Sequence, residues 1–152
     1  RETYSFDWFC EGHVHTLHVH PEMISYIAEA GARRIQLGIE AGTQEVLDAY
    51  RKGSTLDEIR DVVVRCRDAG IEQIYSNIIL GGHFLLAMFM KKFAVHEELI
   101  RLGQGCVEIG VVSYWPLAET SITNHPEQYD LKIVDKDFIT LSVDHSFQTE
   151  TE

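Results

Sequence analysis

The 152-residue sequence has few cysteines, few basic residues and no long apolar run, and each shortage narrows what the protein can be. Its three cysteines are odd in number and show no CxxC spacing, so they indicate reduced thiols in a cytoplasmic protein. Thirteen basic residues against 24 acidic ones give a net charge of -11, which argues against a nucleic-acid-binding surface. No apolar run reaches the roughly 20 residues of a membrane-spanning helix, and no signal peptide is visible. With 45% hydrophobic residues, the composition is that of a globular protein with one core.

A unit of helix, glycine stop and strand recurs along the first 120 residues. The strand isoleucines Ile35, Ile74 and Ile109 follow one another at intervals of 39 and 35 residues. Repeated units of this length build parallel sheets with right-handed crossovers. We therefore predict an α/β fold, a partial (β/α) barrel with outer helices over residues 1–120, and an irregular extension over 121–152. The expected strands are Tyr4–Cys10, 33–40, Ile71–Leu80, Val107–Trp115 and a short one at Leu131–Val134. The expected helices are 21–31, 43–52, Leu56–Ala69, Phe84–Leu102 and a short one near Ser121–Tyr129.

The strand over residues 33–40 has one apolar and one polar face. Ile35, Leu37 and Ile39 alternate with a polar set that ends in Glu40. In α/β proteins ligands bind at the carboxyl ends of the strands, where this acid lies. Glu40 is therefore a candidate ligand group, although an acid here also suits the amino end of the next helix. The polar set is Gln36, Gly38 and Glu40.

The next strands add further candidates for the same face. On Ile71–Leu80, alternation groups Tyr75 and Asn77 with Ile79. A carboxylate, an amide and glycines at adjacent strand ends are suited to hold a polar small molecule, with Ile79 as an apolar wall. On the last strand the periodicity leaves two choices for this face, Ser113 with Trp115 or Val112 with Tyr114.

Two of the expected helices have clear apolar stripes. The helix Leu56–Ala69 begins with a capping box of Thr55 and Glu58, and Cys66 falls on its stripe, which predicts a packing role. In the long helix His96 is expected at the surface or its boundary. The expected stripe of that helix is Phe89, Phe93, Leu99 and Ile100.

A histidine-rich loop over residues 12–20 suggests a different chemistry. His13 and His15 form an HxH pair, which in amidohydrolase-like and PHP-type barrels binds Zn²⁺, Fe or Mn²⁺. Those families need further ligands at later strand ends, where this sequence offers Glu40, Asn77 and His83. A metal-dependent hydrolase is the first alternative, and a non-catalytic scaffold segment is the second.

Four stretches in order resemble the radical S-adenosylmethionine (SAM) enzymes over about residues 4–120. The closest resemblance is to the branch of methylthiotransferases, coproporphyrinogen dehydrogenases and cobalamin-binding members. It implies strands three to six of a six-stranded partial barrel, with SAM, a [4Fe–4S] cluster and, in some members, cobalamin as cofactors. The stretches are Gly38–Gly42, Val46–Gly53, Thr55–Gly70 and Asn77–Gly82.

The resemblance also implies roles for individual residues. Glu40 occupies the position of an acid or glutamine that contacts SAM, and Lys52 that of a basic residue that meets the SAM carboxylate. Asn77 corresponds to a polar side chain near the ribose. Ile79 and Trp115 correspond to residues that pack on adenine.

The sequence departs from the family where the cluster would be held. The CxxxCxxC motif and the glycine-glycine-glutamate stretch are absent, and Gly82-His83 stands where glycine-proline is common. We therefore expect a fragment of a longer enzyme that neither binds the cluster nor cleaves SAM by itself. The substrate and reaction type stay open, and exposed sheet edges predict self-association.

Overall fold

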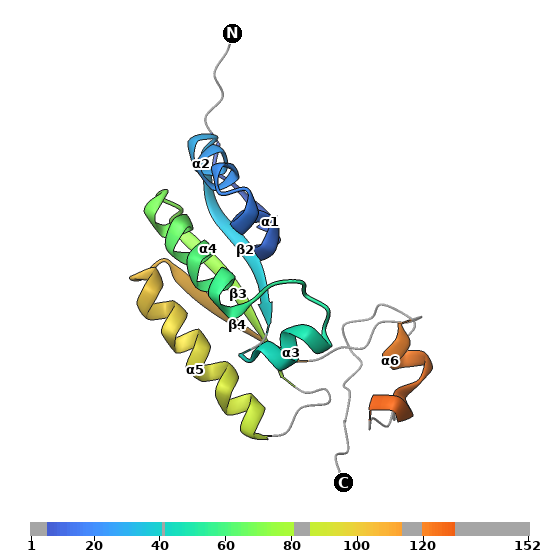
Figure 1. The fold of residues 1–152 in the computed structure, drawn as a ribbon. Coiled ribbons are helices and arrows are strands. Elements are labelled where there is room, and N and C mark those ends of the chain that lie inside the picture. Colours follow the sequence, from blue (N-terminus) through green and yellow to red (C-terminus); the bar gives the residue numbers. More distant parts are fainter. Residues whose placement is uncertain (1–5, 41, 81–85, 114–119, 130–152) are drawn as a thin grey trace.

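A computed structural model describes residues 6–40, 42–80, 86–113 and 120–129. Four strands form one parallel sheet in the order β1-β2-β3-β4, with helices between them (Figure 1). This arrangement confirms the predicted α/β class and agrees with a partial (β/α) barrel. The strands are β1 (Trp8–Gly12), β2 (Ala32–Glu40), β3 (Gln73–Leu80) and β4 (Val107–Ser113). The helices are α1 (Val14–Val19), α2 (Glu22–Glu29), α3 (Gln44–Ala49), α4 (Leu56–Asp68), α5 (Leu86–Gly103), α6 (Ser121–Asn124) and the 3-10 helix η1 (Pro126–Tyr129).

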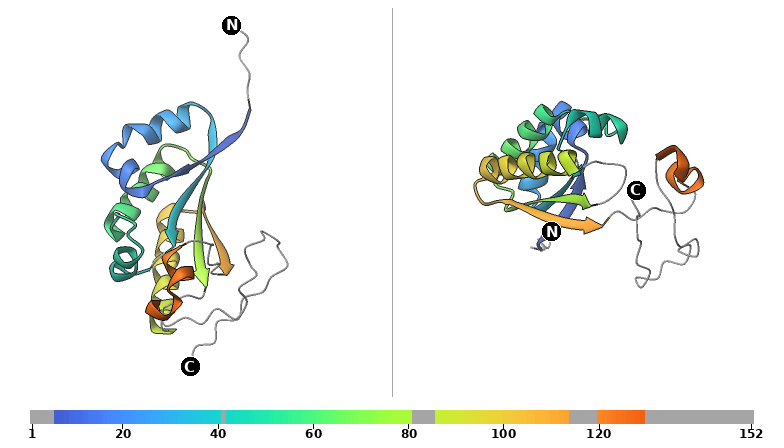
Figure 2. Two further views of the ribbon diagram at one scale, coloured as in Figure 1. Left: turned by 90° about the vertical axis from the view of Figure 1, so that its right-hand side faces the viewer. Right: turned by 90° about the horizontal axis from the view of Figure 1, so that it is seen from below.

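Helices α1 to α5 cover one face of the sheet, and none of the described helices covers the opposite face, which is called the open face below (Figure 2). The apolar set of β2, Ile35, Leu37 and Ile39, is buried on the covered face, as predicted. Cys66 on α4 is fully buried in the same core, which confirms its packing role. Further core members come from α3 and α4: Val46, Leu47, Ile59, Val62 and Val63.

Helix boundaries follow local signals. Thr55 and Glu58 form the predicted capping box, in which Thr55 N–H donates to Glu58 at 2.8 Å and Glu58 N–H donates back to the Thr55 hydroxyl at 3.2 Å. Helix α3 ends three residues before the predicted Lys52, because Arg51 takes a left-handed backbone conformation with φ of 53°. That early end leaves Lys52 in the connection to α4.

Two predictions for the helices are wrong. The histidine-rich segment is not a loop, since residues 14–19 form α1, which buries Val14 and Leu17 at helical spacing. In α5, Leu99 is buried as predicted, but Phe93 and Ile100 are 40% and 45% exposed. Lys92 and His96 are buried instead, each only 2% exposed. The face at 92, 96 and 99 follows helical spacing as well as the predicted stripe does, so tertiary packing decided between them.

Several other predictions concern residues at or beyond the ends of the described segments. Strand β1 begins at Trp8 rather than Tyr4, which lies outside the described residues, as do Trp115 and the predicted strand Leu131–Val134. The short helix predicted near Ser121 is present as α6 and η1. The domain boundary at residue 120 and self-association through the sheet edges stay predictions. No helix in the described part of the chain is both long and apolar enough to cross a bilayer.

Candidate functional site

A pocket of about 340 Å³ opens at the carboxyl ends of β1 and β2. Its polar floor is the open face of β2, and its rim comes from the turn after β1 and the connection between α3 and α4. This is the end of a parallel sheet at which ligands bind in α/β proteins. The lining residues are Glu11, Gly12, His13, Val14, Gln36, Gly38, Glu40, Lys52 and Ser54.

An ion pair between Glu40 and Lys52 stands in this pocket. The Lys52 ammonium lies 2.6 Å from the Glu40 carboxylate, and both side chains are about a quarter exposed. Glu40 ends β2 with φ of 52°, and the early end of α3 returns Lys52 to the strand end. A Cβ at Gly38 would lie 3.5 Å from the Lys52 ammonium, so the glycine leaves space beside the pair.

Glu40 does not cap the helix that follows it. The Thr43 hydroxyl accepts the Val46 N–H at 3.3 Å and caps α3 itself. The alternative interpretation of Glu40 as a helix cap is therefore wrong, and its carboxylate faces the pocket with Lys52.

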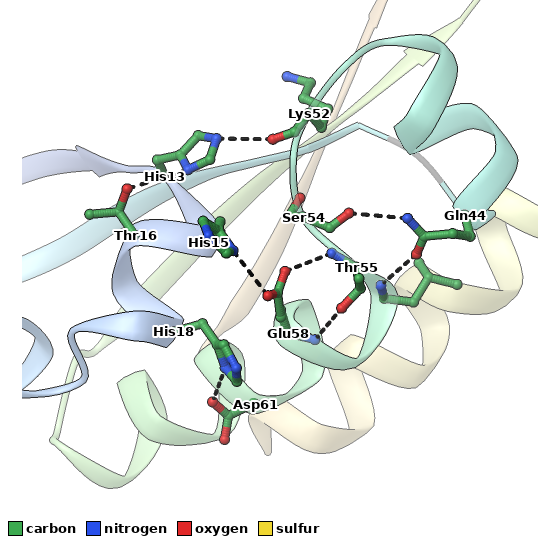
Figure 3. A network of polar contacts seen from close by, with 11 residues as sticks. His13, His15, Thr16, His18, Gln44, Lys52, Ser54, Thr55, Glu58 and Asp61 are labelled. Carbon is green, nitrogen blue, oxygen red and sulfur yellow. Dashed lines mark hydrogen bonds and ion pairs between the residues drawn. The ribbon is translucent and has the colours of Figure 1, made fainter.

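The histidines of α1 and the turn before it hold the pocket's rim in place. His13 Nε2 lies 3.0 Å from the Lys52 carbonyl oxygen and donates to it, because a carbonyl only accepts (Figure 3). His15 pairs with Glu58 at 3.0 Å, and His18 pairs with Asp61 at 2.8 Å (Figure 3). Three contacts thus join α1 and the turn before it to the connection to α4 and to α4 itself.

These pairings give no support to the metal-dependent hydrolase. His13 and His15 have separate partners, and the described part of the chain holds no group of three or more metal-ligating side chains.

Burial alone would raise the pKa of Glu58. The hydrogen bond from the Thr55 N–H and the contact with His15 outweigh burial and lower that pKa, so Glu58 carries charge in the pair.

A buried polar layer lies on the covered side of the sheet, near Glu40. His96 Nδ1 donates to the Lys92 carbonyl at 2.7 Å, and His96 Nε2 lies 3.4 Å from the hydroxyl of the buried Ser76. Burial lowers the pKa of His96. Burial also lowers the pKa of Lys92, against the opposing effect of the Glu40 charge. Glu40 therefore acts electrostatically on two lysines, Lys52 in the pocket and Lys92 in α5.

Asn77 shares the open face with Glu40 but is not among the pocket's lining residues. Its Oδ1 is buried without a hydrogen-bond partner among the residues that the structure describes, and a Cβ at Gly110 would meet it at 2.6 Å. Asn77 thus lies over the backbone of Gly110 on β4.

The β3–β4 register puts Val112 beside Ile79, so Val112 rather than Ser113 belongs to the face of β4 that adjoins Asn77. The side chain of Ile79 and the whole of Trp115 are outside what the structure describes.

Sequence reasoning missed Glu11 and Ser54 in the pocket. Glu11 pairs with Gln36 in the β1–β2 register, so alternation along β1 would have put it on the polar face if the strand had been predicted to extend that far. Ser54 is buried in the connection after α3 and had no periodic signal.

The three cysteines all lie on the covered side of the sheet. Cys66 is in the core, and Cys10 and Cys106 pack against it. Burial raises the pKa of the Cys66 thiol to about 12 and also raises the pKa values of the other two. None of them is among the lining residues of the pocket, so these thiols are not available to a metal group bound there.

Comparison with protein families agrees with the geometry. The model of the Radical SAM superfamily matches residues 7–91, from the start of β1 into α5 and more than half of the chain. No curated protein sequence matches the chain. The match does not distinguish branches of the superfamily and says nothing of cobalamin. It does cover β1 to β3, the end of β2 with Glu40, and the Lys52 connection, and the chain belongs to the radical SAM superfamily.

Proposed function

We propose that the pocket at the ends of β1 and β2 binds SAM and that the chain forms part of a radical SAM enzyme. The observation that carries the proposal is the ion pair of Glu40 and Lys52 inside that pocket. SAM carries a carboxylate and an ammonium on its methionine part, and the pair offers one complementary charge for each. The pocket volume is within the range of small-molecule sites, although only part of SAM would fit in it.

The residues of the chain bind and orient in this proposal. Lys52 is the donor for the SAM carboxylate, and Glu40 is the acceptor for the amino group. His13 fixes the backbone of Lys52 through its carbonyl, which holds the ammonium at the strand end. Asn77, whose Oδ1 lacks a hydrogen-bond partner, is assigned to the ribose, and Ile79 and Trp115 to adenine. Bound SAM, together with a [4Fe–4S] cluster held elsewhere, would supply radical chemistry for hydrogen abstraction from a substrate.

The cysteines of this chain do not fit the cluster. None of the three lines the pocket, all of them lie in the core or against it, and they do not have the CxxxCxxC spacing. We propose that the cluster ligands belong to sequence outside these 152 residues. The branch of the superfamily rests on the resemblance alone and stays a proposal, and the resemblance leaves the choice between oxidoreductase and transferase chemistry open.

Isothermal titration calorimetry of SAM binding to the full chain tests whether the pocket binds SAM. Losing a charge-assisted hydrogen bond costs about 1.5–3 kcal/mol, so Lys52→Met is expected to weaken SAM binding about 10- to 150-fold. Lys91→Met is the matched control, because Lys91 is an exposed lysine on α5 away from the pocket. Equal SAM affinities for the two variants would refute the role of Lys52.

The scaffold alternative predicts that the complete gene product binds no SAM. If neither the chain nor the complete protein binds SAM saturably in the calorimetric titration, the scaffold alternative is favoured. An iron and sulfide assay on the complete protein then separates a degenerate enzyme, which has no cluster, from an enzyme whose SAM site lies elsewhere.

A further inference from the structure

The side chain of Arg34 is on the open face of β2. Among the described residues this side chain makes no hydrogen bond or ion pair, and its Nε atom is buried without an acceptor. In a chain with a net charge of -11, an arginine in the sheet that lacks an acidic partner is unexpected. Five other arginines each contact a carboxylate, whereas the exposed Arg51 has no such contact among the described residues; the five are Arg33, Arg60, Arg65, Arg67 and Arg101.

The guanidinium of Arg34 lies over an aromatic ring. Its Cζ lies 4.2 Å from the centre of the Tyr75 ring on the neighbouring strand. The Tyr75 hydroxyl lies directly over Gly110, where a Cβ would collide with it. Contact with a positioned ring restricts the guanidinium before any ligand arrives, so less entropy is lost on binding. Because Nε is buried, a ligand would have to reach the guanidinium through its two Nη atoms.

That edge matches the geometry of an oxyanion. The two parallel N–H groups of a guanidinium bind a carboxylate or phosphate in a bidentate manner. Two acids on the same face decide between these ligands. Glu11 stands on β1, and Glu108 pairs with Tyr75 in the β3–β4 register and accepts a hydrogen bond from Gln73. Their charges disfavour a doubly charged phosphate more than a singly charged carboxylate.

We propose that Arg34, stacked on Tyr75, binds a carboxylate group of the substrate. Arg34 is the third residue of β2 and Glu40 the last, so six strand steps put the two sites about 20 Å apart. The carboxylate would therefore lie at the far end of the open face from the SAM pocket. That the carboxylate belongs to the substrate of a radical SAM reaction rests on the proposed function. The carboxylate site itself rests on Arg34 and Tyr75 alone.

Nuclear magnetic resonance of the ¹⁵N-labelled full chain tests the site, with the Arg34 Nε–H signal as the readout. Benzoate is the probe, and neutral benzamide of the same shape is the control ligand. We expect a saturable shift of the Arg34 signal in the millimolar range with benzoate and none with benzamide. Arg51 is the matched internal control, because it is exposed and outside the sheet. An equal, non-saturating shift at Arg51 and Arg34 would overturn the proposal.

Two variants separate stacking from charge. Tyr75→Phe keeps the ring and should bind benzoate as the natural chain does, whereas Tyr75→Leu should weaken binding at least 5-fold. Arg34→Lys keeps the charge but not the bidentate edge, and its benzoate affinity, read from the backbone amide of Tyr75, should fall by a similar factor. Unchanged affinity in Arg34→Lys would overturn the proposal, and this conservative change does not depend on the tolerance of the fold for Tyr75→Leu.

A SAM titration of the same sample distinguishes this proposal from the previous one. SAM should shift the amide signals of Gly38 and Ser54 and leave the Arg34 signal unchanged. Benzoate binding without SAM shifts supports the carboxylate site and removes its assignment to a radical SAM substrate. SAM shifts without benzoate binding refute the carboxylate site alone. A saturable SAM shift at Arg34 would also refute it, because the site would then belong to the cofactor.

Discussion

His96 is expected to make the stability of the protein fall in mildly acidic solution. The side chain is 2% exposed, and burial lowers its pKa below the ordinary value of 6.5. In the unfolded chain His96 takes up a proton near pH 6.5, whereas in the native protein it stays neutral at lower pH. The unfolded state therefore binds more protons, and the free energy of unfolding drops as the pH falls below about 6.5. This loss stops once the pH is below the native pKa.

The size of the effect follows from proton linkage. Between pH 7.5 and pH 5.5, one histidine that titrates at 6.5 when unfolded and stays neutral when native lowers the stability by up to about 1.4 kcal/mol. Urea unfolding at the two pH values measures the loss in the natural chain and in His96→Gln. Because glutamine does not titrate, the difference between the two proteins should narrow at pH 5.5. Parallel stability changes in both proteins would refute the argument that His96 is buried and neutral.

Three further predictions concern packing, capping and thiol chemistry. Gly110→Ala should lower the stability by about 1–3 kcal/mol, because its Cβ would collide with Tyr75 and Asn77, and an unchanged melting temperature would contradict that packing. Thr55→Ala removes the cap of α4 and should lower the free energy of unfolding in urea by about 1 kcal/mol, because loss of a cap costs about 0.5–2 kcal/mol. A loss below about 0.3 kcal/mol would argue against the capping box. Cys66, with a pKa of about 12, should resist iodoacetamide at pH 7.5 until the protein unfolds, and stoichiometric labelling of the native protein would contradict its burial.

The strand pattern around Glu40 could be predicted because two independent rules agree there. Alternation separates Ile35 and Leu37 from Gln36, and a parallel sheet covered on one face buries only the apolar set. The capping box of Thr55 and Glu58 was equally readable, since it depends on residues three positions apart. Such local signals survive folding because no distant contact competes with them.

The features that the sequence did not predict correctly depend on tertiary contacts. The two choices for the buried face of α5 differ little in helical spacing, and the presence of Ser76 beneath it favours His96 over Phe93. Six-residue α1 has no side-chain cap and little helix propensity, and it is stabilised by burial of Leu17 and by the contacts of His15 and His18 with α4. Glu11 joins the pocket only through its pairing with Gln36, which the sequence of β1 alone does not reveal.

The most direct test of the SAM pocket is the SAM affinity of the complete gene product carrying Glu40→Ala and Lys52→Ala together. Removing both members of the ion pair leaves neither of the two charges without its partner in the pocket, so the fold should tolerate the double change better than either single one. If the pair holds the methionine part of SAM, the double variant should bind SAM at least about 100-fold more weakly while its circular dichroism stays unchanged. A double variant that folds and binds SAM with the natural affinity would contradict the account.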